Sequence, residues 1–305
     1  MHDRSCGNTR PIFARRMVPM FIQLVVSGLL LGCIYSLIAM GLSLIWGVMG
    51  IVNFAHGAFV MLAMYAAYYG DQLFRIDPLL FTPMAIILLF IFGLVVYQIV
   101  IQYVVDGPYV SRLLATFGLG FFLINMAQFL WSPNFRTIKQ SMVHGVWNLG
   151  TVMIELPKLA ASIGSILVAT LVFLFIRKTR TGQAIQAISA DKMGAALMGI
   201  NLKRLAAFAF GLGIACAGAA GSLLATFYYI FPDVASLFGL IALVAVALGG
   251  FGSIEGAFLG ALILGLVETL GGYYIDPNWK YALMFLIYLG IVLIRPQGLL
   301  GWGKV

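Results

Sequence analysis

Polar side chains are rare within the long apolar segments of this 305-residue chain, and those few are the candidates for chemistry. Asn53 and His56 lie three residues apart, so a helix would place them on one face. A polar group inside such a segment is costly unless it faces a cavity or a partner. His56 is therefore either a proton relay or substrate contact, or a hydrogen-bond anchor between helices, and we favour the anchor. Glu268 is expected to be solvated near an interface.

The motifs of the commonest reactions are missing. There is no Gly-x-x-x-x-Gly-Lys-[Ser/Thr] phosphate loop, and the single Gly-Lys pair is Gly303-Lys304, so the chain is not predicted to hydrolyse ATP by itself. There is no His-Glu-x-x-His pair for a zinc protease, and the three cysteines show no Cys-x-x-Cys spacing. These absences argue against an enzyme and against a metal site.

The composition indicates a membrane protein. Hydrophobic residues make up 62% of the chain and charged residues 9%, whereas soluble domains are about half apolar and about a quarter charged. Between Arg16 and Asp71 no Asp, Glu, Lys or Arg occurs, and one crossing needs only about 20 apolar residues. The runs do not alternate with the period of two that a barrel requires. We predict an all-α, polytopic transmembrane bundle of about 8–10 spans.

Nine spans are expected, with ends uncertain by a few residues. They lie near residues 20–40, 52–69, 79–103, 113–131, 159–176, 205–230, 235–249, 257–270 and 281–294. The span at 257–270 is short and contains glycines, which predicts a tilted or partial crossing. A strand-like run at 150–156 falls in the longest external loop, residues 132–158.

Small residues indicate where helices pack closely, because membrane helices associate through them. Gly28-x-x-x-Gly32 and Gly256-x-x-x-Gly260 have the spacing of close helix contacts, and the run 211–221 is small on almost every face. We interpret 211–221 as part of a helix in the middle of the bundle, or against a partner subunit.

The distribution of Lys and Arg predicts the orientation, because these residues favour the cytoplasmic side. Segment 177–204 carries six cations and one anion, and the residues before Met17 carry four arginines and Asp3. We therefore expect a basic cytoplasmic tail at 1–19, one transmembrane domain at 20–301 and a cytoplasmic loop at about 177–204. Within that loop, 182–200 is predicted to be one short amphipathic helix, suited to the membrane surface or to a partner's groove.

This orientation creates a parity problem, because five spans separate the tail from residue 177. Either the run 17–70 makes three short or re-entrant passes, or the tail lies outside. Gly41, Gly47 and Gly50 interrupt the run, and irregular backbone is tolerated at depth when protein surrounds it. We favour the irregular passes.

Four stretches resemble the branched-chain amino acid ABC importer permeases of the LivH type. They are residues 41–57 (GLSLIWGVMGIVNFAHG), 114–119 (LATFGL), 248–253 (LGGFGS) with 256–257 (GA), and 295–301 (RPQGLLG). The resemblance runs from about residue 21 to 301. It implies a multi-pass subunit of the bacterial inner membrane that works with a second homologous permease, two ATP-binding subunits and a periplasmic substrate-binding protein. The partner subunits would bind ATP, so no cofactor of its own and no nucleic acid are expected.

The resemblance also suggests site residues. The stretch Ala195-Ala196-x-x-Gly199-Ile200 falls in the loop that couples such permeases to their ATPases, although the leading glutamate of the family motif is missing. Asn53, His56, Gly57 and Thr116 are the candidate substrate-pathway residues. The expected cargo is leucine, isoleucine or valine. The alternatives are a urea or short-amide permease on the same scaffold and an ion-coupled secondary transporter, for which relay groups at depth are sparse.

Overall fold

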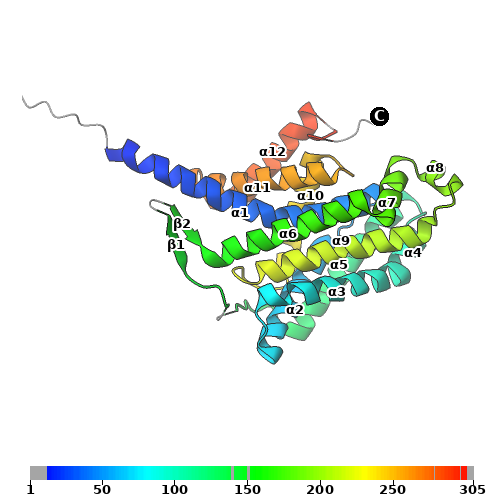
Figure 1. Ribbon diagram of the computed structural model, residues 1–305, viewed down its shortest axis with the longest axis horizontal. Helices are drawn as coiled ribbons and strands as arrows, with labels where there is room; N and C mark the ends of the chain where they lie inside the picture. Colours follow the sequence, from blue (N-terminus) through cyan, green and yellow to red (C-terminus); the bar gives the residue numbers. More distant parts are fainter. Residues whose placement is uncertain (1–11, 139–140, 150–151, 278, 296, 301–305) are drawn as a thin grey trace, which may run out of the picture.

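The computed structural model describes residues 12–138, 141–149, 152–277, 279–295 and 297–300, and these form a bundle of long helices with one small hairpin (Figure 1). The helices are α1 (Ile12–Met49), α2 (His56–Phe74), α3 (Pro78–Val96), the π-helical turn η1 (Tyr97–Ile101), α4 (Gln102–Val104), α5 (Tyr109–Trp131), α6 (Leu156–Lys178), α7 (Arg180–Ala190), α8 (Lys192–Leu197), α9 (Leu202–Leu224), α10 (Val234–Gly249), α11 (Ile254–Tyr274) and α12 (Lys280–Ile294). Strands β1 (Val146–Leu149) and β2 (Val152–Glu155) pair antiparallel; β2 lies within the strand-like run expected at 150–156, and β1 precedes it.

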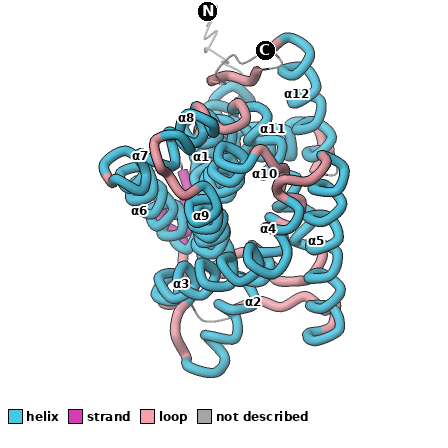
Figure 2. The backbone as a smooth tube through the Cα atoms, turned by 90° about the vertical axis from the view of Figure 1, so that its right-hand side faces the viewer, coloured by secondary structure: helices cyan, strands magenta, loops and turns pink. Residues whose placement is uncertain are grey.

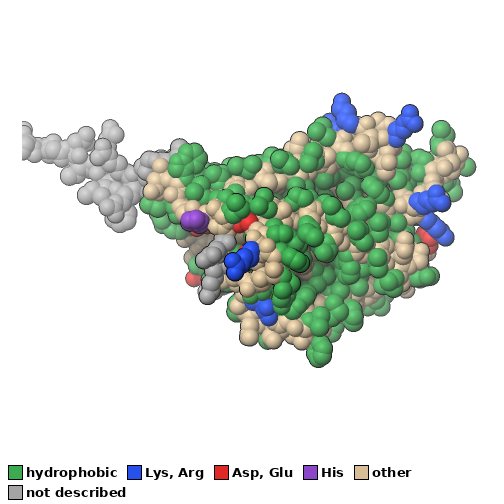
Figure 3. All heavy atoms as spheres, turned by 60° about the horizontal axis from the view of Figure 1, so that its bottom comes forward, with side chains coloured by type: hydrophobic (Ala, Val, Ile, Leu, Met, Phe, Trp, Pro, Cys, Tyr) green, Lys and Arg blue, Asp and Glu red, His purple; other side chains and the backbone are tan. Residues whose placement is uncertain are grey.

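The prediction of an all-helical membrane bundle is confirmed. Six helices are long and apolar enough to cross a membrane: Met20–Met49 in α1, Pro78–Val104, α5, α6, α9 and α11. The other three expected spans coincide with helices that are not among these six: α10 and α12, which are apolar but shorter, and the 19-residue α2. Helix α11 is continuous over 21 residues and long enough to cross, so the structure does not support the partial crossing expected near 257–270. On the face in Figure 3, apolar side chains cover most of the surface and charged ones gather toward its two ends.

Helix α9 forms the centre of the bundle, as its small residues predicted. In its most apolar stretch of 18 residues, 83% is buried inside the bundle, against 22% in α5. Helix α9 packs on α1, α2 and α3 (Figures 1 and 2). A Cβ on Gly213 would lie 2.6 Å from the Gly41 carbonyl oxygen, and one on Gly221 would lie 2.4 Å from that of Val60. Only glycine lets these backbones approach so closely.

Helices α1 and α11 pack through the predicted small-residue spacing. A Cβ on Gly28 or Gly32 would lie 2.9 Å or less from the backbone of α11. On α11 itself, Gly260 meets the carbonyl of Ala245 in α10. The two expected glycine pairs therefore mark real helix contacts.

The prediction that the charge-free run makes three irregular passes is wrong. Helix α1 continues through Gly41 and Gly47 and ends at Met49, where Gly50 adopts φ +63° and its N–H donates to the Trp46 carbonyl at 2.7 Å. Gly41 faces the backbone of Gly213. It serves close packing and does not break the helix, whereas Gly50 provides the left-handed residue that ends it.

Because α1 makes a single pass, the tail at 1–19 and the loop at 177–204 are not on the same side of the bundle as expected, as far as the tail is described. Its C-terminal end lies beside α7, where Gly47 faces Ser189, whereas near its start Met20 accepts a hydrogen bond from Tyr273 at the far end of α11. The described start of α1 and the segment containing α7 and α8 therefore lie at opposite ends of the bundle (Figure 1). Most of the predicted 1–19 tail, residues 1–11, lies outside the described residues.

Candidate functional site

The break between α1 and α2 brings three of the predicted pathway residues together. Residues 50–53 have no regular structure, a turn follows, and His56 begins α2. The Thr116 hydroxyl on α5 lies 3.1 Å from the Val52 carbonyl oxygen and donates to it. The Asn53 side-chain oxygen accepts from the Ala55 N–H at 3.2 Å, which stabilises the turn locally.

His56 ties the break to the middle of α1. Its ring is 1% exposed, and Nε2 lies 3.0 Å from the Ile38 carbonyl oxygen. Because a carbonyl only accepts, Nε2 must carry the proton, and Nδ1 is then an acceptor in the neutral ring. This contact agrees with the interpretation of His56 as a hydrogen-bond anchor between helices.

Two buried polar atoms at the break have no hydrogen-bond partner among the described residues: Asn53 Nδ2, a donor, and His56 Nδ1. A buried polar atom without a partner costs about 1–3 kcal/mol, so such atoms are rare outside functional sites. The break therefore holds a donor and an acceptor that the protein fold does not use.

Gly57 has a packing role. A Cβ at this position would lie 1.9 Å from the Ala235 carbonyl oxygen and 2.4 Å from the Gly239 nitrogen, both on α10. The same region includes Gly120 of α5, whose Cβ would lie 3.1 Å from the Cα of Ala55. Helices α1, α2, α5 and α10 thus meet around the break.

The predicted coupling segment is two helices instead of one over 182–200. Asp191 ends α7 and starts α8, because its side-chain oxygen accepts from the Met193 N–H at 3.0 Å. Thr179 and Asn201 cap α7 and α9 in the same way, at 3.0 and 3.1 Å. Side-chain caps stabilise helix starts, so three of them make this segment a defined elbow.

The four predicted coupling residues form the end of α8. The Ile200 N–H donates to the Ala195 carbonyl, the Gly199 N–H donates to the Ala196 carbonyl, and Gly199 has φ +80°. These two bonds and the left-handed glycine define a Schellman helix end. The residues thus shape α8, and Ala195 is buried.

Sequence reasoning missed the apolar side chains that α8 presents outward. Met193, Leu197 and Met198 are 77%, 84% and 83% exposed. The available signal was their i, i+4, i+5 spacing in the short segment bounded by Asp191 and Asn201, which places large apolar residues near one another on a helix.

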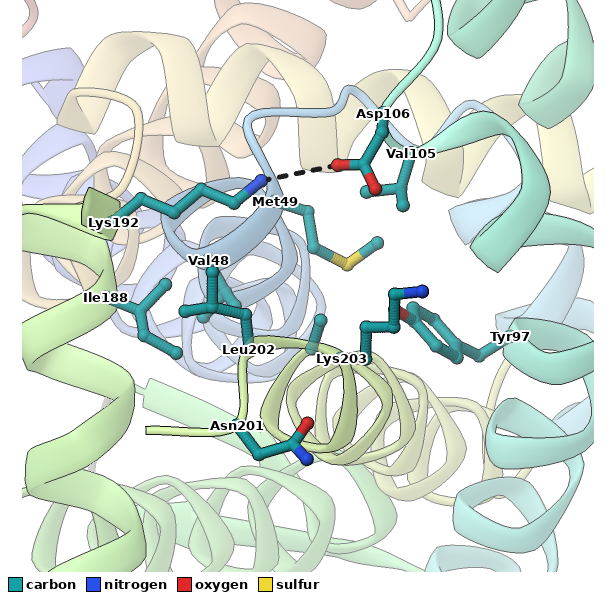
Figure 4. A pocket seen from close by; sticks show the side chains of 11 residues that line it. Val48, Met49, Tyr97, Val105, Asp106, Ile188, Lys192, Asn201, Leu202 and Lys203 are labelled. Carbon is teal, nitrogen blue, oxygen red and sulfur yellow. Dashed lines mark ion pairs between the residues drawn. The ribbon is translucent and has the colours of Figure 1, made fainter. Parts of the chain in front are cut away.

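A cavity of about 220 Å³ lies behind this elbow, between the ends of α1, α4 and α9 (Figure 4). At its mouth, Lys192 of α8 pairs with Asp106 at 3.6 Å, and both side chains are more than half exposed. Tyr97, in the π-helical turn, lines the opposite wall. The ion pair connects α8 to the loop between α4 and α5.

The expectation that Glu268 is simply solvated is wrong. Glu268 is 6% exposed and accepts from the Tyr35 hydroxyl at 2.8 Å and from the Lys280 ammonium at 2.9 Å. The contacts join α1, α11 and α12. Nearby, burial raises the pKa of Tyr228, and the hydroxyl of Tyr281 raises it further. No sequence motif connects these residues.

Apolar helices packed through small residues, an irregular break between α1 and α2 and a capped elbow at one end are the features of a multi-pass membrane protein. A family model described as "Branched-chain amino acid transport system / permease component" matches residues 24–292, and the chain belongs to this family. It is an ABC permease component, a transport protein and not an enzyme. Membership implies ATPase and binding-protein partners and no cofactor of its own.

Named relatives match along nearly the whole chain. The high-affinity branched-chain amino acid transport system permease protein LivH of Escherichia coli is 31% identical over 93% of this chain and 97% of its own. Its counterpart BraD of Pseudomonas aeruginosa is 30% identical over the same shares. The fructose import permease protein FrcC of Rhizobium meliloti is 30% identical over 42% of this chain and 38% of its own.

Proposed function

We propose that this chain is the permease subunit that carries leucine, isoleucine and valine through a bacterial inner membrane. The observation that carries the proposal is the similarity to LivH and BraD over 93% of the chain. The similarity to the fructose permease FrcC covers less than half of it. A urea or short-amide cargo is the alternative.

Separate ATP-binding subunits dock on α7 and α8 in this proposal. The support is the outward face of Met193, Leu197 and Met198, which an aqueous surface would not favour without a partner. The capped elbow would transmit a pull from the ATPase to α6 and α9 as a rigid lever, since Thr179 and Asn201 hold both its ends.

The binding protein docks at the opposite end, near the β-hairpin. Two contacts give this external surface a defined shape. Arg136 donates to the Tyr69 hydroxyl at 3.1 Å, and Asp77 accepts from the Ser141 hydroxyl at 2.9 Å. This assignment places the start of α1 outside and α7 and α8 in the cytoplasm. A second, homologous permease completes the translocation path.

The substrate path passes the break between α1 and α2. The support is that the break holds an unused donor, Asn53 Nδ2, and an unused acceptor, His56 Nδ1, and an amino acid carries a carboxylate and an ammonium group that could use them. Alternating access would open this break to one side at a time.

The cargo is tested by deleting the gene and measuring uptake of labelled leucine, isoleucine, valine, urea and acetamide by whole cells. Loss of branched-chain uptake alone, restored by the intact gene, is the expected result. Loss of urea or acetamide uptake with leucine uptake unchanged would replace the proposal with its alternative.

Docking is tested with Leu197→Glu, which should abolish co-purification of the ATPase subunits. The matched control is Met142→Glu, a residue 71% exposed at the opposite end of the bundle. Equal loss with both variants, or with neither, would contradict docking on α8.

A further inference from the structure

A second cavity, of about 360 Å³, opens on the side of the bundle between α6 and α11. Both helices pack on α1, and Met40 of α1 lines the cavity. Ile166 and Phe173 of α6 and Phe258 and Leu259 of α11 supply most of its apolar walls. We call this feature the lateral groove. It lies apart from the break and from the elbow cavity.

The lateral groove and the Arg177 end of α6 beyond it together correspond in length to one leaflet. From Ile166 to Arg177 the α6 axis rises about 17 Å at ~1.5 Å per residue. Half of a hydrocarbon core ~30 Å thick is about 15 Å. A lipid chain lying in the groove from the middle of the bilayer would therefore place its headgroup at the level of Arg177, at the α7 end.

Charge is concentrated at the headgroup end of the lateral groove. Arg177 pairs with Glu255, a groove residue, and its guanidinium lies 4.3 Å from the ring centroid of Phe173. The side chains of Arg177 and Glu255 are 54% and 52% exposed, so the guanidinium keeps donors for a second anion. Lys178 and Arg180 are also exposed at this end. This end therefore carries the three cations Arg177, Lys178 and Arg180 and the one carboxylate of Glu255.

The walls of the lateral groove suit a flexible chain better than another helix. Transmembrane helices associate through small residues that let their backbones approach. Here most of the lining side chains are large, with Ala169 and Thr170 the exceptions, and the Thr170 hydroxyl already donates to the Ile166 carbonyl at 2.7 Å. An acyl chain needs neither small residues nor polar partners.

We propose that the lateral groove binds one anionic phospholipid, with an acyl chain along Ile166 and Phe258 and its phosphate on Arg177. Basic sites at the cytoplasmic ends of transmembrane helices recognise anionic headgroups by charge. The site itself requires only that the chain spans a membrane. Its assignment to the cytoplasmic leaflet rests on the proposed function.

The test uses the full-length chain in nanodiscs of phosphatidylcholine mixed with phosphatidylglycerol, with bound lipid counted by native mass spectrometry. Thr170→Trp fills the groove without changing charge and should abolish the retained phosphatidylglycerol. Leu171→Trp, at an exposed position on α6 that does not line the groove, is the matched control. Equal retention by both variants would overturn the proposal.

A second variant keeps the test independent of packing changes. Arg177→Gln should lower the preference for phosphatidylglycerol over phosphatidylcholine about fivefold, because one interfacial cation contributes about 1 kcal/mol. Arg204→Gln, an exposed cation on α9, should leave the preference unchanged. An unchanged preference in Arg177→Gln would overturn the headgroup assignment.

Another protein could occupy the lateral groove instead. Thr170→Cys forming a disulfide or cross-link to the second permease in native membranes would overturn lipid binding. These measurements do not depend on the cargo, so failure of the lipid proposal and failure of the transport proposal are distinguishable.

Discussion

Gly199 has the backbone conformation that decides how α8 ends. Its φ of +80° is unfavourable for residues with a Cβ by about 1–2 kcal/mol, although no atom lies within 4 Å of the place a Cβ would take. We expect Gly199→Val to uncouple ATP hydrolysis from transport in reconstituted vesicles by distorting the elbow. Gly199→Asn should retain most coupling, because asparagine tolerates the left-handed region. Equal uncoupling by both variants would show that conformation is not the cause.

The Asn53 side-chain oxygen accepts a hydrogen bond from the Ala55 N–H, whereas its side-chain nitrogen has no hydrogen-bond partner among the described residues. Asn53→Asp keeps an oxygen for the Ala55 N–H and replaces the unused amide donor with a second carboxylate oxygen, which repels a substrate carboxylate. We expect this variant to reach the membrane in normal amounts and to lose uptake. Thr116→Ser, which keeps the hydroxyl bonded to the Val52 carbonyl, is the control and should transport normally. Normal uptake by Asn53→Asp would remove Asn53 from the substrate path.

The buried Glu268 carboxylate depends on two partners. Glu268→Gln leaves the Lys280 ammonium, only 27% exposed, without its counter-ion. Removing one member of a buried pair costs ~3–5 kcal/mol, and partial exposure of Lys280 favours the lower end, about 3 kcal/mol. Unfolding by denaturing detergent measures the loss. The double variant Glu268→Gln, Lys280→Met should recover part of it, and additive losses would contradict a direct pair.

At the scale of elements, glycine contacts set how close α1 and α11 lie. A Cβ on Gly265 would meet the Gly28 carbonyl oxygen at 2.4 Å, so Gly265→Ala must push the helices apart. We expect a loss of about 1–3 kcal/mol in the same unfolding assay. Gly290→Ala on α12 has nothing within 4 Å and should be neutral or stabilising. Equal effects would mean that these contacts are not tight.

At the scale of the whole molecule, α1 crosses the bundle once. In a background with Cys6, Cys33 and Cys216 replaced by alanine, Met20→Cys and Met193→Cys should react with an impermeant thiol reagent from opposite sides of the membrane. Both are exposed positions, at 43% and 77%. Labelling from the same side would contradict the single pass and restore a cytoplasmic tail.

Local sequence determined a large part of this protein. Apolar runs of about 20 residues are sufficient for a membrane helix whatever surrounds them, so the class of fold followed directly. Small-residue spacing at Gly28 and Gly32 identified a packing face, and the motif at residues 41–57 identified the family. Helix caps such as Asp191 also act over two or three residues and are visible in the sequence. The prediction of a single helix over 182–200 overlooks this cap.

Tertiary structure alone decided the rest, because it depends on which helices become neighbours. Tyr35 and Glu268 are 233 residues apart, and nothing along the chain pairs them. The sequence predicts a helix break at Gly41, but close approach of Gly213 makes it a packing residue inside a continuous α1. That continuity puts the described start of α1 at the opposite end of the bundle from α7 and α8. A glycine has the same sequence signature in a break and in a close contact, and only the neighbouring helix distinguishes the two.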